Sequence, residues 1–291
     1  MLIKPRNTLK NSMADEGAIR LPFPVFTANI INGNPEKTEL KAAGDARYFG
    51  GFKFSADKND SEISPDNALP TGYNLVDVWS KEKGEAYRAY VGRWLYVAPI
   101  ARRFGWFHNE RKNYDSSAVQ ILCYMGNKTD TGLVACGLVI LSAGSYAGQS
   151  LDATFKRFDN ATRKQRNEMG GIDSNYFWRK IGTMGADIQQ VEKGKTEKSP
   201  ITPVYVYGDD PQNKTALEKL TAVYTPSVLG KTFVGEDLAD KMDAIFPQCA
   251  AWLEDWKNKT GNVKRESAPV NVAAIVEHAD PVTGEIDPFY L

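Results

Sequence analysis

The sequence predicts an α+β protein built mainly from strands: an OB-like antiparallel barrel with an added helical segment and a flexible acidic C-terminal tail. Four segments, 87–97, 102–108, 118–125 and 133–141, alternate in polarity or are rich in β-branched residues. After residue 209 the apolar spacing becomes helical, and the end of the chain is acidic. The 291 residues are enough for one large domain or two small ones with a sizeable core.

The N-terminal part, to about Thr71, is divided by turn residues such as those at 32–35 and 64–66. The pieces between these turns, 23–31 and 48–54, are short and apolar or aromatic, which favours strands over helices. The four alternating segments come next and are joined by short connections. They therefore predict an antiparallel meander that closes as a barrel.

A helix is predicted after the meander. Ser150 is a favourable N-cap, the apolar residues between 151 and 158 share one helical face, and the glycine pair 170–171 ends the helix. Two further strands are expected at 175–183 and 204–207, because both segments return to strand-like patterns.

The segment after the last predicted strand is helical in character. Apolar residues recur at helical spacing in 217–224 and 238–246, and a third helix is expected to begin at Pro247, with Trp252 and Trp256 one turn apart. The predicted organisation is a β-rich OB-like domain at 1–208, a helical extension packed on it at 209–260, and a flexible tail at 261–291.

The composition narrows the range of functions. Lysine plus arginine and aspartate plus glutamate both count 36, so a uniformly basic nucleic-acid coat or a polybasic membrane binder is not expected. The three cysteines are too scattered for a disulfide framework, and residues 1–20 lack the apolar stretch of a signal peptide. The longest continuous apolar run, 133–141, is too short to span a bilayer. We therefore expect a soluble, cytoplasmic protein with no membrane partner.

The sequence carries no recognisable catalytic motif. It has no phosphate-binding loop, no GxSxG, no HExxH and no GxGxxG after a strand. The Asp209-Asp210 pair before Pro211 is read as a turn and helix start rather than a metal site, and His108 has no obvious catalytic partner. We expect no enzymatic activity, no cofactor and no metal.

Basic residues interleaved with aromatic residues are the strongest functional signal. The window 86–112 carries five arginines and one lysine against one glutamate, a net charge of +5, together with seven aromatic residues. Single-stranded nucleic acid needs both features, cations along the phosphates and flat rings on which unpaired bases stack. The segment 176–180 repeats the combination. The predicted nucleic-acid-binding residues are Arg88, Tyr90, Arg93, Trp94, Tyr96, Arg102, Arg103, Trp106, Trp178, Arg179 and Lys180.

The same residues admit a second interpretation. A sheet buries one face, so about half of these aromatic side chains belong to the core. Alternation places Arg88, Tyr90, Trp94 and Tyr96 on the exposed face, with the reverse assignment open. If the rings serve only as core and subunit contacts, the chain is a structural or assembly protein such as a virion component. A nuclease, which needs clustered carboxylates and a divalent metal, is the least favoured class.

The end of the chain supports the nucleic-acid interpretation. Residues 277–291 carry four acidic side chains and no lysine or arginine, so the rest of the chain carries +4. This tail ends in Asp287, Pro288, Phe289, Tyr290 and Leu291. It resembles the tails of the single-stranded DNA-binding proteins of bacteria and phages, which are acidic and end in an aromatic residue. In the bacterial family the last residues are acidic and are followed by Pro-Phe, an order that Asp287, Pro288 and Phe289 match. Here two residues follow the phenylalanine, and the acids are spaced rather than contiguous.

The resemblance implies that Asp287, Pro288, Phe289 and Tyr290 dock replication or repair proteins and compete with DNA for the basic groove. We therefore expect a sequence-tolerant single-stranded DNA-binding protein, acting in DNA replication or recombination in a bacterial or phage-infected cell. RNA stays an open alternative as ligand, because stacking platforms do not distinguish it from DNA.

Overall fold

The computed structural model of the chain describes residues 19–31, 51–80, 85–109, 114–183, 191–193, 199–201, 204–207 and 216–260. The strands are β1 (Phe26–Ile31), β2 (Gly51–Ser55), β3 (Asn74–Ser80), β4 (Glu85–Gly92), β5 (Trp94–Asn109), β6 (Tyr114–Thr129), β7 (Gly132–Gly144), β8 (Arg179–Thr183), β9 (Val191–Lys193), β10 (Ser199–Ile201) and β11 (Val204–Val206). The α-helices are α2 (Ala56–Asn59), α3 (Ser145–Glu168), α4 (Ala216–Val223), α5 (Pro226–Thr232), α6 (Glu236–Ile245) and α7 (Ala250–Thr260), and the 3-10 helices are η2 (Asp60–Glu62), η3 (Ser174–Tyr176) and η4 (Phe246–Cys249).

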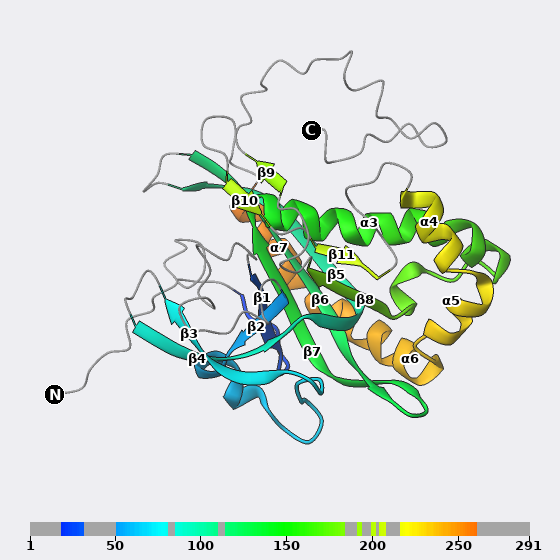
Figure 1. Cartoon of the computed structure of the whole chain (residues 1–291), viewed down its shortest axis with the longest axis horizontal. Helices are drawn as coiled ribbons and strands as arrows, with labels where there is room; N and C mark the ends of the chain where they lie inside the picture. The colour runs from blue at the N-terminus through cyan, green and yellow to red at the C-terminus, as the bar shows by residue number, and fades with distance from the viewer. Residues whose placement is uncertain are drawn as a thin grey trace, which may run out of the picture.

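Nine strands form one curled sheet in the order β11-β8-β5-β6-β7-β1-β2-β4-β3 (Figure 1). The β5–β6–β7 meander is antiparallel, as the alternation predicts. The β1–β7 pair is parallel, so the sheet is mixed, and the prediction of a purely antiparallel sheet is wrong. No hairpin fixes the direction of β1 against β7, because the two strands lie far apart in the sequence. The β-rich α+β class is confirmed.

The curl of the sheet follows from the junction of β4 and β5. These strands stand at opposite sides of the strand order, yet only Arg93 separates them along the chain. The sheet must therefore bend until its two ends approach each other, which makes a half-barrel. Backbone crowding at this point requires glycine: a Cβ on Gly92 would lie 2.7 Å from the Tyr73 ring, and one on Gly51 2.4 Å from the carbonyl oxygen of Gly92.

The bounds of the first two predicted meander strands are wrong. The predicted strand 87–97 breaks at Arg93, and its second half continues without interruption through 102–108 as β5. The register of β5 against β6 shifts between Pro99 and Ala101, where Ile100 forms a bulge. A bulge accommodates a proline inside a long strand, because the missing N–H falls where the ladder is already interrupted.

The main core fills the concave side of the sheet. Phe54, Val97 and Ile121 from the strands pack there against Leu151 and Phe155 of α3. Figure 1 shows α3 crossing the strands, and its apolar stripe thus covers the hollow of the half-barrel.

Helix α3 begins earlier than predicted, and Ser150 is not its N-cap. Ser150 is buried inside the helix, and its hydroxyl accepts a hydrogen bond from the Val204 amide at 2.8 Å and donates to the Val204 carbonyl at 3.3 Å. This residue therefore fastens β11 to α3. The predicted end is confirmed: Gly170 and Gly171 follow the helix with φ of 98° and 77°, values that favour glycine.

A second core lies on the convex side of the sheet. Leu122 and Trp178 pack there against Met242, Cys249 and Trp252 from α6, η4 and α7. The predicted helices near 217–224 and 238–246 are found as α4 and α6. The third predicted helix, with Trp252 and Trp256, is found as α7, but it begins at Ala250, and Pro247 lies in η4 just before it. Helix α5 was not predicted.

One polar contact ties η3 to this helical layer. The Tyr176 hydroxyl donates to Asp243 Oδ1 of α6 at 2.5 Å. This hydrogen bond, with burial as the smaller cause, raises the pKa of Tyr176 to about 12. The phenol must keep its proton to donate, so the contact is sensitive to alkaline pH.

We expect Tyr176→Phe to lower stability at pH 9 and to have a much smaller effect at pH 12. A folded-state pKa above the ordinary value of about 10 means that the stabilisation is complete below pH 10 and is lost as pH rises toward 12. Urea unfolding of both proteins at several pH values between 9 and 12 measures the difference. A difference that stays constant over this range would contradict the assignment.

Candidate nucleic-acid interface

The edge of the sheet formed by β11, β8 and β5 brings aromatic side chains together on its convex face. Gly182 of β8 pairs with Trp94 of β5 on one side and with Tyr205 of β11 on the other. In the next row Lys180 pairs with Tyr96, and its carbonyl accepts a hydrogen bond from the Tyr207 amide at 2.7 Å. Because side chains alternate along each strand, both rows face the same side, opposite the buried Leu95.

Lys180 lies among three of these rings. Its Nζ is 4.5 Å from the centroid of the Trp94 ring, 4.8 Å from that of Tyr207 and 5.8 Å from that of Tyr96. These distances lie within the range of cation–π attraction. Trp94 also meets Tyr205 edge to face, with centroids 5.4 Å apart. We call Trp94, Tyr96, Lys180, Tyr205 and Tyr207 the aromatic–lysine cluster.

Gly182 makes room for the centre of the cluster. A Cβ at this position would lie 2.5 Å from the Trp94 ring, so the indole lies directly over the glycine backbone. Tyr207, at the end of β11, is 53% exposed, whereas the other members are half-buried. The cluster therefore combines a supported indole with an accessible phenol ring.

Two further basic side chains lie near the cluster, Lys128 and Arg93. Burial lowers the pKa of Lys180, and the nearby Lys128 lowers it further. Burial raises the pKa of Tyr205, and Arg93 counters that effect. Lys180 thus lies among the rings, Lys128 acts electrostatically on Lys180, and Arg93 acts on Tyr205. A surface of this kind attracts anions that also carry aromatic groups.

Three of the predicted binding residues, Trp94, Tyr96 and Lys180, belong to the cluster, and Arg93 lies near it. The prediction missed Tyr205 and Tyr207. Their signal was present, since the predicted strand 204–207 reads Val-Tyr-Val-Tyr, with both tyrosines on the same face.

Trp178 and Arg179 do not reach the surface and do not belong to the interface. Trp178 is 2% exposed in the convex core, where its ring lies against Gly126. Arg179 is 1% exposed on the concave side, and its Nη2 is 3.0 Å from Asp159 Oδ1. Its guanidinium also lies over the Phe158 ring, 4.3 Å from the centroid. Trp178 and Arg179 are neighbours in the sequence, but their side chains pack on opposite faces of the sheet.

Arg103 also has a structural role. Its guanidinium lies between two indoles of α7, 3.9 Å from the Trp252 ring centroid and 4.2 Å from that of Trp256. It donates to the Trp252 carbonyl at 2.6 Å and, through Nε and Nη2, to Gln120 Oε1 at 2.9 and 2.6 Å. Burial lowers the pKa of Arg103, and Asp255, 3.9 Å away, counters this shift. Arg103 therefore fixes α7 to β5.

The other predicted binding residues are dispersed. Arg88 and Tyr90 lie on β4, where Arg88 is exposed opposite Asp77. Burial raises the pKa of Tyr90, and a hydrogen bond with Asp60 raises it further. Arg102 and Trp106 lie on the far half of β5, beyond the bulge.

On that half of β5, Arg102 Nε is 2.7 Å from Asp152 Oδ1, and Trp106 meets Phe104 edge to face. The tail residues Asp287, Pro288, Phe289 and Tyr290 lie outside the described residues.

Among the described residues, no three or more histidine, cysteine or acidic side chains lie together as metal ligands. No described helix is both long and apolar enough to cross a membrane. Comparisons with protein-family models, with curated proteins and with solved structures gave no match to this chain.

Proposed function

We propose that the chain is a non-enzymatic protein that binds single-stranded DNA without strong sequence preference, in replication or recombination. The observation that carries the proposal is the aromatic–lysine cluster: an ammonium group among three rings, one of them the exposed ring of Tyr207, with Lys128 and Arg93 near it. We also propose that the curled sheet is an OB-type barrel, because OB-type barrels bind single strands on their curled sheets.

Each part of the cluster has a distinct role in the proposed complex. Lys180 and its basic neighbours bind phosphates, and the accessible ring of Tyr207 stacks on an unpaired base. Trp94, supported from below by Gly182, offers a second ring. Every base has a flat face, so such stacking tolerates any sequence, whereas paired bases in a duplex have no free face to offer.

Titration with a dT oligomer, a matched duplex and an RNA, followed by tryptophan fluorescence at several salt concentrations, tests the proposal. We expect the dT strand to quench the fluorescence and the duplex to have little effect. If the three basic side chains each neutralise one phosphate, the logarithm of the binding constant falls with the logarithm of salt concentration with a slope of about −2.

A salt-independent binding constant, or equal binding of the duplex, would contradict the proposal. If no nucleic acid binds and light scattering reveals large oligomers, the cluster serves subunit contacts, and the chain is an assembly protein such as a virion component.

The acidic tail forms a second part of the proposal. We expect deletion of residues 277–291 to tighten the binding of the dT oligomer, because an anionic segment that competes for the basic surface is removed. The same oligomer titration at low salt measures the change, and a variant with Glu277, Asp280, Glu285 and Asp287 neutralised to amides should reproduce it. Unchanged or weaker affinity would leave only the docking of replication or repair proteins as a role for the tail.

A further inference from the structure

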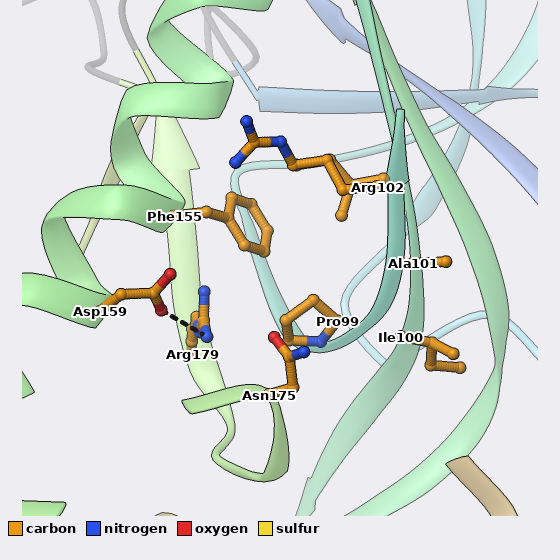
Figure 2. A pocket seen from close by; sticks show the side chains of 9 residues that line it. Pro99, Ile100, Ala101, Arg102, Phe155, Asp159, Asn175 and Arg179 are labelled. Carbon is orange, nitrogen blue, oxygen red and sulfur yellow. Dashed lines mark hydrogen bonds and ion pairs between the residues drawn. The ribbon is translucent and has the colours of Figure 1, made fainter. Parts of the chain in front are cut away.

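A cavity lies on the concave side of the sheet, away from the aromatic–lysine cluster. It has a volume of about 190 Å³ and lies between the bulge of β5, helix α3 and η3 (Figure 2). This is smaller than the roughly 300 Å³ at which pockets for drug-sized ligands begin. It therefore suits a small group, such as one heterocyclic ring system.

Arg179 lines one wall of this cavity and is held in place by hydrogen bonds. Its Nη2 donates to Asp159 Oδ1 and to the Ser174 carbonyl, both at 3.0 Å. Its Nε is buried and has no hydrogen-bond partner among the described residues. Because this Nε is buried, a ligand in the cavity does not contact it directly, but the group senses whether the cavity beside Arg179 is occupied.

Asn175 adds polar groups from η3. Figure 2 shows its carboxamide directed toward Pro99, on the side of the cavity facing Arg179. A carboxamide presents a donor and an acceptor next to each other, which is the pattern that pairs with the edge of a nucleobase. Asp159, which also lines the cavity, provides a further acceptor for an exocyclic amine.

The remaining walls are apolar. Phe155, Ile121 and Pro99 line the cavity, and in Figure 2 the Phe155 ring lies between Arg102 and Arg179. Pockets that hold a single unstacked base combine the same two elements, flat apolar walls and hydrogen bonds to the base edge.

Positive charge lies on the more exposed side of the cavity. Arg102 and Lys156 share the carboxylate of Asp152, at 2.7 and 3.5 Å, so this group of three side chains carries one net positive charge. The side chains of Arg102 and Lys156 are 38% and 45% exposed. A phosphate attached to a base in the cavity would therefore lie beside a cation.

We propose that this cavity binds one nucleobase, with the attached phosphate toward Arg102. The ligand is either a free mononucleotide or one unstacked nucleotide of the bound strand, and the second form rests on the proposed single-strand binding. The carboxamide of Asn175 and the carboxylate of Asp159 hold the base edge, and Phe155 packs on the base.

The ¹⁵N–¹H signal of Arg179 Nε tests the proposal directly. In full-length protein labelled with ¹⁵N-arginine and assigned through its side-chain carbons, this buried group is followed during titration with dAMP, dGMP, dCMP or dTMP. We expect a saturable shift with at least one nucleotide, and none with inorganic phosphate alone. Asn175→Leu, which removes the carboxamide and fills the cavity, should weaken that binding by at least about tenfold.

Asn167→Leu is the matched control, since Asn167 is exposed on α3 and does not line the cavity. No shift with any nucleotide, an equal shift with phosphate alone, or equal loss in both variants would overturn the proposal.

A dT oligomer added to the same sample distinguishes the two sources of the base. If the oligomer shifts the signal, the base comes from the bound strand; if only mononucleotides do, the ligand is free. The oligomer titration by tryptophan fluorescence is an independent measurement of single-strand binding. If the oligomer binds but no ligand shifts the Arg179 signal, only the cavity proposal is refuted.

Discussion

Replacing Trp94 and Tyr207 together by alanine is expected to weaken the binding of a dT oligomer by at least about 30-fold. Stacking on one aromatic side chain contributes roughly 1–3 kcal/mol per base, and the variant removes two of the rings around Lys180. Lys180 keeps its charge, so we expect the salt dependence to change little while the affinity falls. This combination separates stacking from phosphate attraction.

The measurement is fluorescence anisotropy of a labelled oligomer, because removing Trp94 alters the intrinsic fluorescence. Phe246→Ala provides a matched control: its ring is 52% exposed, close to the 53% of Tyr207, but it lies in η4. The thermal midpoint of each variant shows that the fold is retained. If the double variant binds within threefold of the unaltered chain, the cluster is not the binding surface.

Local patterns predicted the meander because they were sufficient to define it. The segments 118–125 and 133–141, which lie in β6 and β7, are rich in β-branched and apolar residues and are joined by a tight turn, so both the elements and their pairing are encoded within one short stretch. The parallel β1–β7 pair and the bend at Arg93 depend on strands that are far apart in the sequence. No local pattern contains this information.

The sequence pattern likewise predicted only part of the candidate site. Alternation correctly grouped Trp94 with Tyr96 and opposed them to Leu95, because that contrast lies within one strand. It could not tell which face of each strand another layer would cover. Arg179 is buried under α3 and Arg103 under α7, although each reads in the sequence as a cation beside an aromatic residue. A basic and aromatic composition is thus shared by a ligand surface and by cation–π contacts inside the protein.

Arg103 allows a direct test of this distinction. Arg103→Ala is expected to lower the free energy of unfolding by about 2–4 kcal/mol, because it removes a cation held between two indoles and leaves Gln120 and the Trp252 carbonyl without their donor. The affinity of the folded variant for a dT oligomer should be unchanged.

An arginine that binds a DNA phosphate would behave in the opposite way. Loss of such an exposed arginine weakens DNA binding and leaves stability nearly unchanged. Urea unfolding and oligomer binding, measured on the same preparation at a temperature where the variant is folded, give both quantities. Arg88→Ala is the control, because Arg88 is exposed on β4 away from the helical layer, and we expect its stability to change by less than about 0.5 kcal/mol. If Arg103→Ala weakens oligomer binding and leaves the free energy of unfolding unchanged, Arg103 contacts DNA. In that case α7 must move away from β5 when DNA binds. The stability loss that we expect instead makes the Trp252–Arg103–Trp256 stack one of the contacts that hold the helical layer on the sheet, together with the apolar core on the convex side.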